Sequence, residues 1–143
     1  MFIGEYTYSI DDKKRLAVPL KFRELLGKKA VITRGLDQCL FLYPMKEWGL
    51  LAERISKLPL AQADASGFSR LMLTGAMEVS FDNLGRMLVP DFLKTYASLG
   101  KRVVVAGLYN RVEVWDEKKW TDYKQKAEQE AGDMAERLKE LNL

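Results

Sequence analysis

The sequence predicts a mainly β protein with peripheral α-helices, in which two similar halves fold around one shared core. The nonapeptide DDKKRLAVP at 11–19 recurs as DNLGRMLVP at 82–90, with the acid, the arginine, the valine and the proline in register. Segments rich in β-branched residues, which are typical of strands, follow both copies. Because a half of about seventy residues buries too little surface to be stable alone, we expect the halves to interlock into one domain.

Each half begins with a predicted hairpin. A short strand, EYTYSI at 5–10 or AMEVSF at 76–81, leads into a turn that carries the Asp-x-x-x-Arg motif. A second strand, RLAV at 15–18 or RMLV at 86–89, leaves the turn. The apolar and β-branched residues around a polar turn favour this interpretation.

A short helix is expected after each hairpin, at 19–27 and 90–100, because proline suits the first turn of a helix and glycine the position just after its end. Two more strands around a glycine turn should follow in each half, at 29–35 and 39–44 and at 102–107 and 111–115. The predicted organisation is a first motif at 5–47, linking helices at 48–75, a second motif at 76–119 and a C-terminal amphipathic helix at 120–143.

The C-terminal helix carries an apolar stripe opposite a highly charged face. The stripe consists of Trp120, Tyr123, Ala127, Met134, Leu138 and Leu141. It could pack on its own domain or on a neighbouring copy. We predict a contact between subunits, with Trp48 and Leu51 of the first linking helix as the counterpart.

Composition narrows the function. The segment from Lys13 to Arg34 contains eight basic residues and one acid, Glu24. This excess of positive charge indicates either an anion-binding surface or a solvated lysine-rich face. The chain has no histidine and one cysteine, Cys39, which we expect to be buried and inert; this excludes Cys/His zinc sites and histidine-dependent nucleophiles. No apolar run reaches the length of a membrane span and no signal peptide is recognisable, so a cytoplasmic protein is expected.

The repeated motif carries the candidate binding chemistry. Asp11 and Asp82 can accept backbone N–H bonds and so orient the two loops. Arg15 and Arg86 offer planar forks of donors that suit phosphates or the O6/N7 edge of guanine. The alternative is that each Asp–Arg pair only staples its loop, although an exposed ion pair contributes only about 0–1 kcal/mol.

At these residues the chain resembles the MraZ family, through the two nonapeptides, the start MFIGEY and the segments LFLYPMKEW and VEVWDEKKW. The resemblance implies two tandem AbrB-like half-motifs interlocked into one pseudo-twofold swapped-hairpin β-barrel. It implies a nucleoid-associated regulator that binds short direct repeats in the promoter of its own division and cell-wall operon, as a homo-oligomeric ring. Arg15, Arg86, Lys13 and Lys14 would bind double-stranded DNA. Lys14 departs from the family's glycine, which raises the question of the first loop's shape.

Two other classes of function are compatible with a protein of this size. The first is a small enzyme on a related double-psi barrel. The sequence has no histidine, no recognisable nucleophile and no cofactor motif, so we expect no catalytic residue, metal, cofactor or small-molecule substrate. A structural ring or adaptor that binds acidic protein surfaces remains the alternative. Retention on double-stranded DNA at two salt concentrations, compared with retention on an acidic protein, distinguishes a DNA-binding regulator from such an adaptor.

Overall fold

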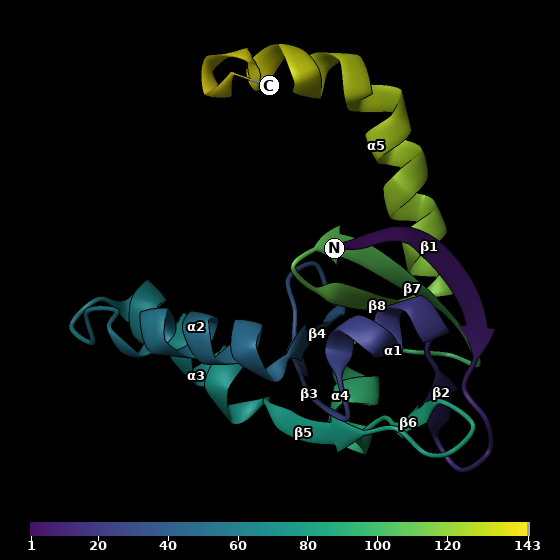
Figure 1. The fold of residues 1–143 in the computed structure, drawn as a ribbon. Helices are drawn as coiled ribbons and strands as arrows, with labels where there is room; N and C mark the ends of the chain where they lie inside the picture. The colour runs from purple at the N-terminus through teal and green to yellow at the C-terminus, as the bar shows by residue number, and fades with distance from the viewer. Residues whose placement is uncertain (143) are drawn as a thin grey trace.

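The computed structural model describes residues 1–142, so Leu143, the last residue of the predicted C-terminal helix, lies outside the described part. In chain order the elements are β1 (Phe2–Ser9), β2 (Arg15–Ala17), α1 (Leu20–Leu26), β3 (Lys29–Arg34), β4 (Leu40–Pro44), α2 (Met45–Ser56), α3 (Ala63–Thr74), β5 (Met77–Ser80), β6 (Arg86–Leu88), α4 (Asp91–Tyr96), β7 (Arg102–Tyr109), β8 (Val112–Asp116), α5 (Glu117–Arg137) and a 3-10 turn (Lys139–Leu141). The predicted class, mainly β with peripheral helices and a C-terminal helix, is confirmed (Figure 1).

The two halves interlock through their strands. Six strands form an antiparallel sheet in the order β1-β7-β8-β4-β3-β5, and β2 pairs with β6 in a two-stranded ribbon. Strand β1 of the first half therefore pairs with β7 of the second, and β5 of the second half pairs with β3 of the first. The order reads the same from either end when the halves are exchanged, which places a pseudo-twofold axis between β8 and β4. Each half thus supplies the strand that completes the other.

One apolar core lies between the sheet, the ribbon and the two short helices. Leu16 and Met87 enter it from the ribbon, and Phe22 and Leu93 enter it from α1 and α4; all four are fully buried. The ring of Phe22 meets the rings of Phe2 and Tyr6 edge to face, with centroids 5.5 Å apart in both pairs. Because both halves supply this core, neither could bury it alone.

A second apolar cluster covers the outer face of the sheet. Along β4 the side chains alternate, with Leu40 and Leu42 in the inner core and Phe41 and Tyr43 in the outer cluster. Helices α2, α3 and the root of α5 contribute partly buried side chains to this cluster, among them Trp48, Leu51, Phe68 and Trp120. The four central strands, β3, β4, β7 and β8, are therefore buried on both faces over most of their length, which accounts for their nearly continuous apolar runs.

Cys39 belongs to this outer cluster. It is only 1% exposed, as expected from its apolar surroundings. Burial raises the pKa of its thiol far above the ordinary cysteine value. A neutral thiol of this kind is unreactive, because the thiolate is the nucleophile.

Helix α5 is anchored only at its beginning. The ring centroids of Trp120 and Tyr123 lie 5.4 Å and 5.1 Å from that of Trp115 in β8. Glu5 in β1 accepts a hydrogen bond from the indole N–H of Trp120 and lies 2.7 Å from the ammonium group of Lys124. Farther along, the helix leaves the sheet and its last turns bend (Figure 1). None of the residues of α5 is fully buried, so its distal stripe has no partner in the described chain.

Across residues 1–142, no helix combines the length and the apolar character that crossing a bilayer requires.

Candidate nucleic-acid interface

The first loop, residues 11–15, is built around one carboxylate. Oδ1 of Asp11 accepts hydrogen bonds from the backbone N–H groups of Lys13 and Arg15, both at 2.9 Å. Oδ2 of Asp11 accepts a bond of 2.8 Å from Nε of Arg15. The short strand β2 begins at this arginine, so the backbone and the side chain of Arg15 are positioned by the same aspartate.

The second loop, residues 82–86, repeats this geometry. Asp82 accepts bonds of 2.9 Å from the backbone N–H groups of Leu84 and Arg86, and one of 2.9 Å from Nε of Arg86. The pKa values of the Asp11 and Asp82 carboxyl groups are both lowered, chiefly by the N–H donated by the arginine backbone. Both acids are therefore charged at neutral pH and hold their arginines by charge-assisted bonds.

Lys14 occupies the position that glycine holds in the second loop, without changing the loop's shape. Its φ is +63°, compared with +74° for Gly85, so both residues lie in the left-handed region. The N–H of each donates a bond of 2.9 Å to the carbonyl of the loop's aspartate. The Nζ atom of Lys14 lies 2.6 Å from Oδ1 of Asp91 at the start of α4. A lysine can thus adopt the conformation that is more easily reached by glycine.

The ribbon brings the two loops side by side. In its register Ala17 stands opposite Arg86, and the loops exchange backbone bonds with the strands beside them: Val18 N–H donates to the Gly85 carbonyl at 3.1 Å, and Val89 N–H to the Lys14 carbonyl at 2.9 Å. As a result, Nη1 of Arg86 lies 3.7 Å from Oδ2 of Asp11. All four predicted motif residues, Asp11, Arg15, Asp82 and Arg86, are gathered in one cluster.

The cluster leaves donors available for a ligand. Each arginine uses Nε for its own aspartate, and the side chains of Arg15 and Arg86 remain 32% and 26% exposed. The intraloop ion pair considered as an alternative is therefore present. Because such a pair contributes little stability, its main effect is to fix the direction of the guanidinium fork. Lys13 is exposed beside it and makes no ion pair within residues 1–142.

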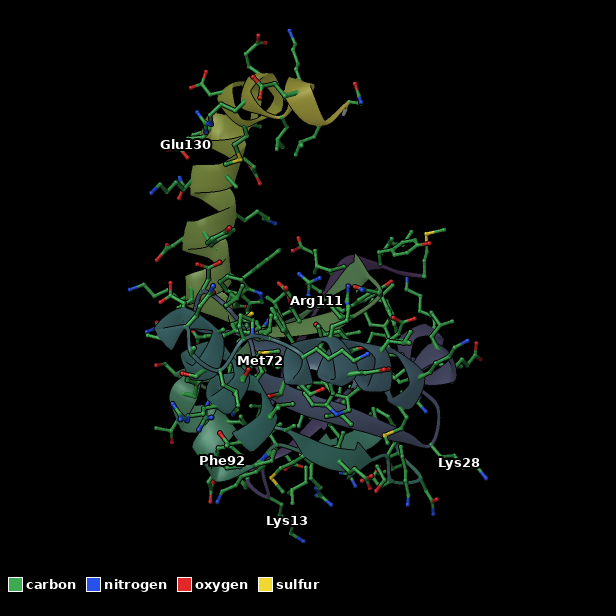
Figure 2. The ribbon with its side chains drawn as sticks, turned by 90° about the vertical axis from the view of Figure 1, so that its left-hand side faces the viewer. Lys13, Lys28, Met72, Phe92, Arg111 and Glu130 are labelled. Carbon is green, nitrogen blue, oxygen red and sulfur yellow. The ribbon has the colours of Figure 1, made fainter. Side chains whose placement is uncertain are left out.

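The location of the loops separates them from the C-terminal helix. Lys13 projects from one end of the molecule, and Glu130 of α5 lies at the opposite end (Figure 2). Within the described chain, no group of three or more carboxylate or cysteine side chains is arranged to hold a metal ion. The polar chemistry at the loop end is thus that of arginines and lysines oriented by carboxylates.

One residue of this region was not predicted as a site residue. Nε of Arg23 in α1 donates to the carbonyl of Val18 at 3.0 Å, and its guanidinium rests on the backbone of Gly85. A Cβ atom at Gly85 would lie 2.5 Å from the guanidinium carbon. The sequence showed Arg23 only as one member of a basic run. The one sequence feature that could have indicated this contact is Gly85, because the first loop has Lys14 and not glycine at the equivalent position.

The chain is similar to known proteins over its whole length. The family model described as "MraZ protein, putative antitoxin-like" matches it twice, at residues 1–71 and 72–142. Proteins named "Transcriptional regulator MraZ" from Natranaerobius thermophilus, Clostridium tetani and Syntrophomonas wolfei are 48%, 44% and 43% identical to it, each over 143 residues and the full length of both chains. These names describe regulators and not enzymes, in agreement with the expectation from the sequence.

Proposed function

Because the chain belongs to the MraZ family, we propose that it regulates transcription by binding double-stranded DNA through the paired Asp-x-x-x-Arg loops. The observation that carries the proposal is the cluster in which Arg86 of the second loop approaches Asp11 of the first, at 3.7 Å. Two arginine forks held side by side at one end of the molecule form a surface suited to a groove of DNA. The relatives are named as transcriptional regulators, and this supports the same role here.

Each residue of the loops has a distinct part in this proposal. Arg15 and Arg86 present their free Nη groups to the O6 and N7 atoms of guanine or to phosphates. Lys13 and Lys14 contribute charge to the DNA backbone, which positions the protein without reading sequence. Asp11 and Asp82 keep the guanidinium planes oriented, so that less conformational freedom is lost when DNA is bound.

The small size of one loop pair suggests how the protein reaches useful affinity. A single subunit makes only a few contacts, while linked copies raise avidity by about 10²–10⁴-fold without new contacts. We therefore propose a homo-oligomeric ring that binds short direct repeats in the promoter of its own division and cell-wall operon and is associated with the nucleoid. The distal stripe of α5, which lacks a partner in the described chain, is the proposed subunit contact.

The test compares arginine variants on promoter DNA. Arg15→Ala and Arg86→Ala should each weaken binding to a fragment with several repeats by about 1–3 kcal/mol per contact, which repeated subunits multiply. Thermal stability should change little, because an exposed ion pair is weak. Arg70→Ala, an exposed arginine in α3, serves as the matched control and should bind as the native chain does. A large loss of melting temperature with intact DNA affinity would show that the arginines only staple their loops.

A further inference from the structure

A basic pocket lies beside the second loop, under α1. It has a volume of about 620 Å³. Its lining includes Arg23, Lys28 and Lys29 together with Leu20, Ser80 and Phe81. We name it the α1 pocket. Its walls combine three cationic side chains with two apolar ones, which is a composition suited to an anion carried on an apolar frame.

The pocket is continuous with the second loop through two connections. Ser80 and Phe81 lead directly into Asp82, the aspartate of that loop. Arg23 reaches from the pocket to the loop, where its guanidinium rests against the Cβ-free side of Gly85 and its Nε is held by the Val18 carbonyl. A ligand that contacts Arg86 can therefore extend into the pocket without leaving the protein surface.

The charge of the pocket is largely uncompensated. Glu24 is the one acid in its lining, against three bases. Lys28 and Lys29 are exposed, and neither they nor Arg23 form a salt bridge within the described residues. Figure 2 shows Lys28 projecting outward from the body of the molecule, on the side away from the distal part of α5. These cations are free to meet an external anion.

The pseudo-twofold equivalent of this surface is different. Lys101 and Arg102 correspond to Lys28 and Lys29, but Arg102 is paired with Glu117 of α5 at 3.2 Å. The position of Leu20 is taken by Asp91, whose carboxylate instead binds Lys14 of the first loop. Beside the first loop, Arg102 and Lys14 are therefore compensated by acids, whereas within residues 1–142 none of the three bases of the α1 pocket is.

We propose that the α1 pocket is a subsite for the phosphodiester backbone of DNA, which flanks the second loop alone. This proposal rests on the proposed function and adds to it a defined orientation of each subunit along the DNA duplex. Arg23 offers a planar fork to a phosphate, Lys28 and Lys29 add point charges, and Leu20 and Phe81 form the apolar side against which a deoxyribose packs. Two equivalent loops would present a twofold surface to DNA. A phosphate site on one flank gives each subunit a polarity along the duplex, as direct repeats require.

The experiment measures the salt dependence of DNA binding by fluorescence anisotropy, on a duplex of unrelated sequence and on one that carries promoter repeats. The test variant is Lys28→Ala/Lys29→Ala, because both side chains are exposed and their loss should leave the fold intact. The matched control is the equivalent pair, Lys101→Ala/Arg102→Ala. Melting temperature and mass by light scattering are recorded for all three proteins.

Each neutralised phosphate contributes about −0.9 to the slope of log affinity against log salt. The Lys28/Lys29 variant should therefore lose about 0.9 to 1.8 of slope per bound subunit on both duplexes, and the control pair should lose less. Equal slopes for the native chain and the test variant, or equal losses in test and control, would overturn the pocket proposal. A variant that loses retention on polyglutamate but not on DNA would also overturn it, in favour of an acidic protein ligand.

The failure of the proposed function has a separate signature. If the native chain binds neither duplex, the transcriptional role itself is wrong. If the native chain binds both duplexes and Arg15→Ala abolishes only the preference for repeats, while the lysine variant weakens both equally, the two proposals are supported independently.

Discussion

Arg86 and Asp11, seventy-five residues apart in the sequence, approach to 3.7 Å between Nη1 and Oδ2. The same Oδ2 atom accepts the Nε–H of Arg15 at 2.8 Å. Asp82 has no matching second role, since among the described ion pairs it binds only Arg86. The two halves repeat one motif, but the carboxylate of the first loop serves both arginines.

This asymmetry predicts unequal effects of neutralising the two acids. Asp11→Asn should lower the ratio of affinity for repeat DNA over unrelated DNA by at least about fivefold, because one bidentate base contact is worth about 1–3 kcal/mol. Asp82→Asn should lower this ratio less, because Asp82 orients only Arg86. Affinity for unrelated DNA should not fall in either variant, because a negative charge near phosphates is removed. Competition binding with both duplexes measures the ratio, and a larger effect from Asp82 would contradict the shared role of Asp11.

The left-handed residues of the loops predict opposite responses to substitution. Lys14→Gly should stabilise the protein by about 0.5–1 kcal/mol, because a side chain in this region costs about 1–2 kcal/mol and the greater freedom of unfolded glycine offsets part of the gain. Gly85→Ala should destabilise it by at least about 1–2 kcal/mol, because its Cβ would also meet the Arg23 guanidinium. Urea unfolding measures both. A neutral Gly85→Ala would contradict both the cost of a side chain in the left-handed region and the close contact with Arg23.

The lowered pKa values of Asp11 and Asp82 predict an acid-sensitive contribution to stability. A carboxyl group whose pKa is lower in the folded state stabilises the fold fully above its unfolded value of about 3.9. That contribution is lost as the pH falls below this value and through the lowered folded pKa. The free energy of unfolding between pH 5 and 2 should therefore drop more steeply for the native chain than for Asp11→Asn/Asp82→Asn. Parallel curves would show that the loops do not respond to protonation.

The anchoring of α5 at its first turns makes it possible to test the distal stripe separately for a role in assembly. A chain ending at Gln125 keeps the contacts of Trp120, Tyr123 and Lys124 with Trp115 and Glu5 and removes the distal stripe. It should keep the native melting temperature and show a lower mass by light scattering. A chain ending at Lys118 should also melt earlier, because Trp115 loses its cover. If the chain ending at Gln125 keeps the native mass, the stripe does not hold subunits together.

The interlocked strands predict that neither half folds alone. Residues 1–76 retain β1, β2 and β3 but lose β7, β6 and β5, with which these strands pair. Amide hydrogen exchange of this fragment should show no protected sheet, because its backbone donors and half of the apolar core lack partners. A protected monomeric fragment would show that one half contains a sufficient core.

Much of the local structure could be predicted from the sequence. The strands and most helices lie within a few residues of the predicted ranges, because alternation of apolar residues, proline and glycine act over short stretches. The C-terminal helix, predicted at 120–143, instead ends at Arg137 and is followed by a 3-10 turn. The bonds from Asp11 to Lys13 and Arg15 are also local, since a spacing of two to four residues is enough to form the loop. The repeat itself indicated that the second loop would do the same with Asp82 and Arg86.

The tertiary structure decided which distant residues meet. Strand pairing across the halves brings Arg86 to Asp11, and the placement of α1 puts Arg23 on Gly85; neither contact follows from spacing along the chain. The repeated motif also concealed a difference, since the charges of Lys28 and Lys29 stay free while Arg102 is paired with Glu117. Local sequence sets the conformation of each loop through short-range hydrogen bonds, whereas the surroundings of a loop depend on contacts between residues far apart in the chain, which exist only once the core has formed.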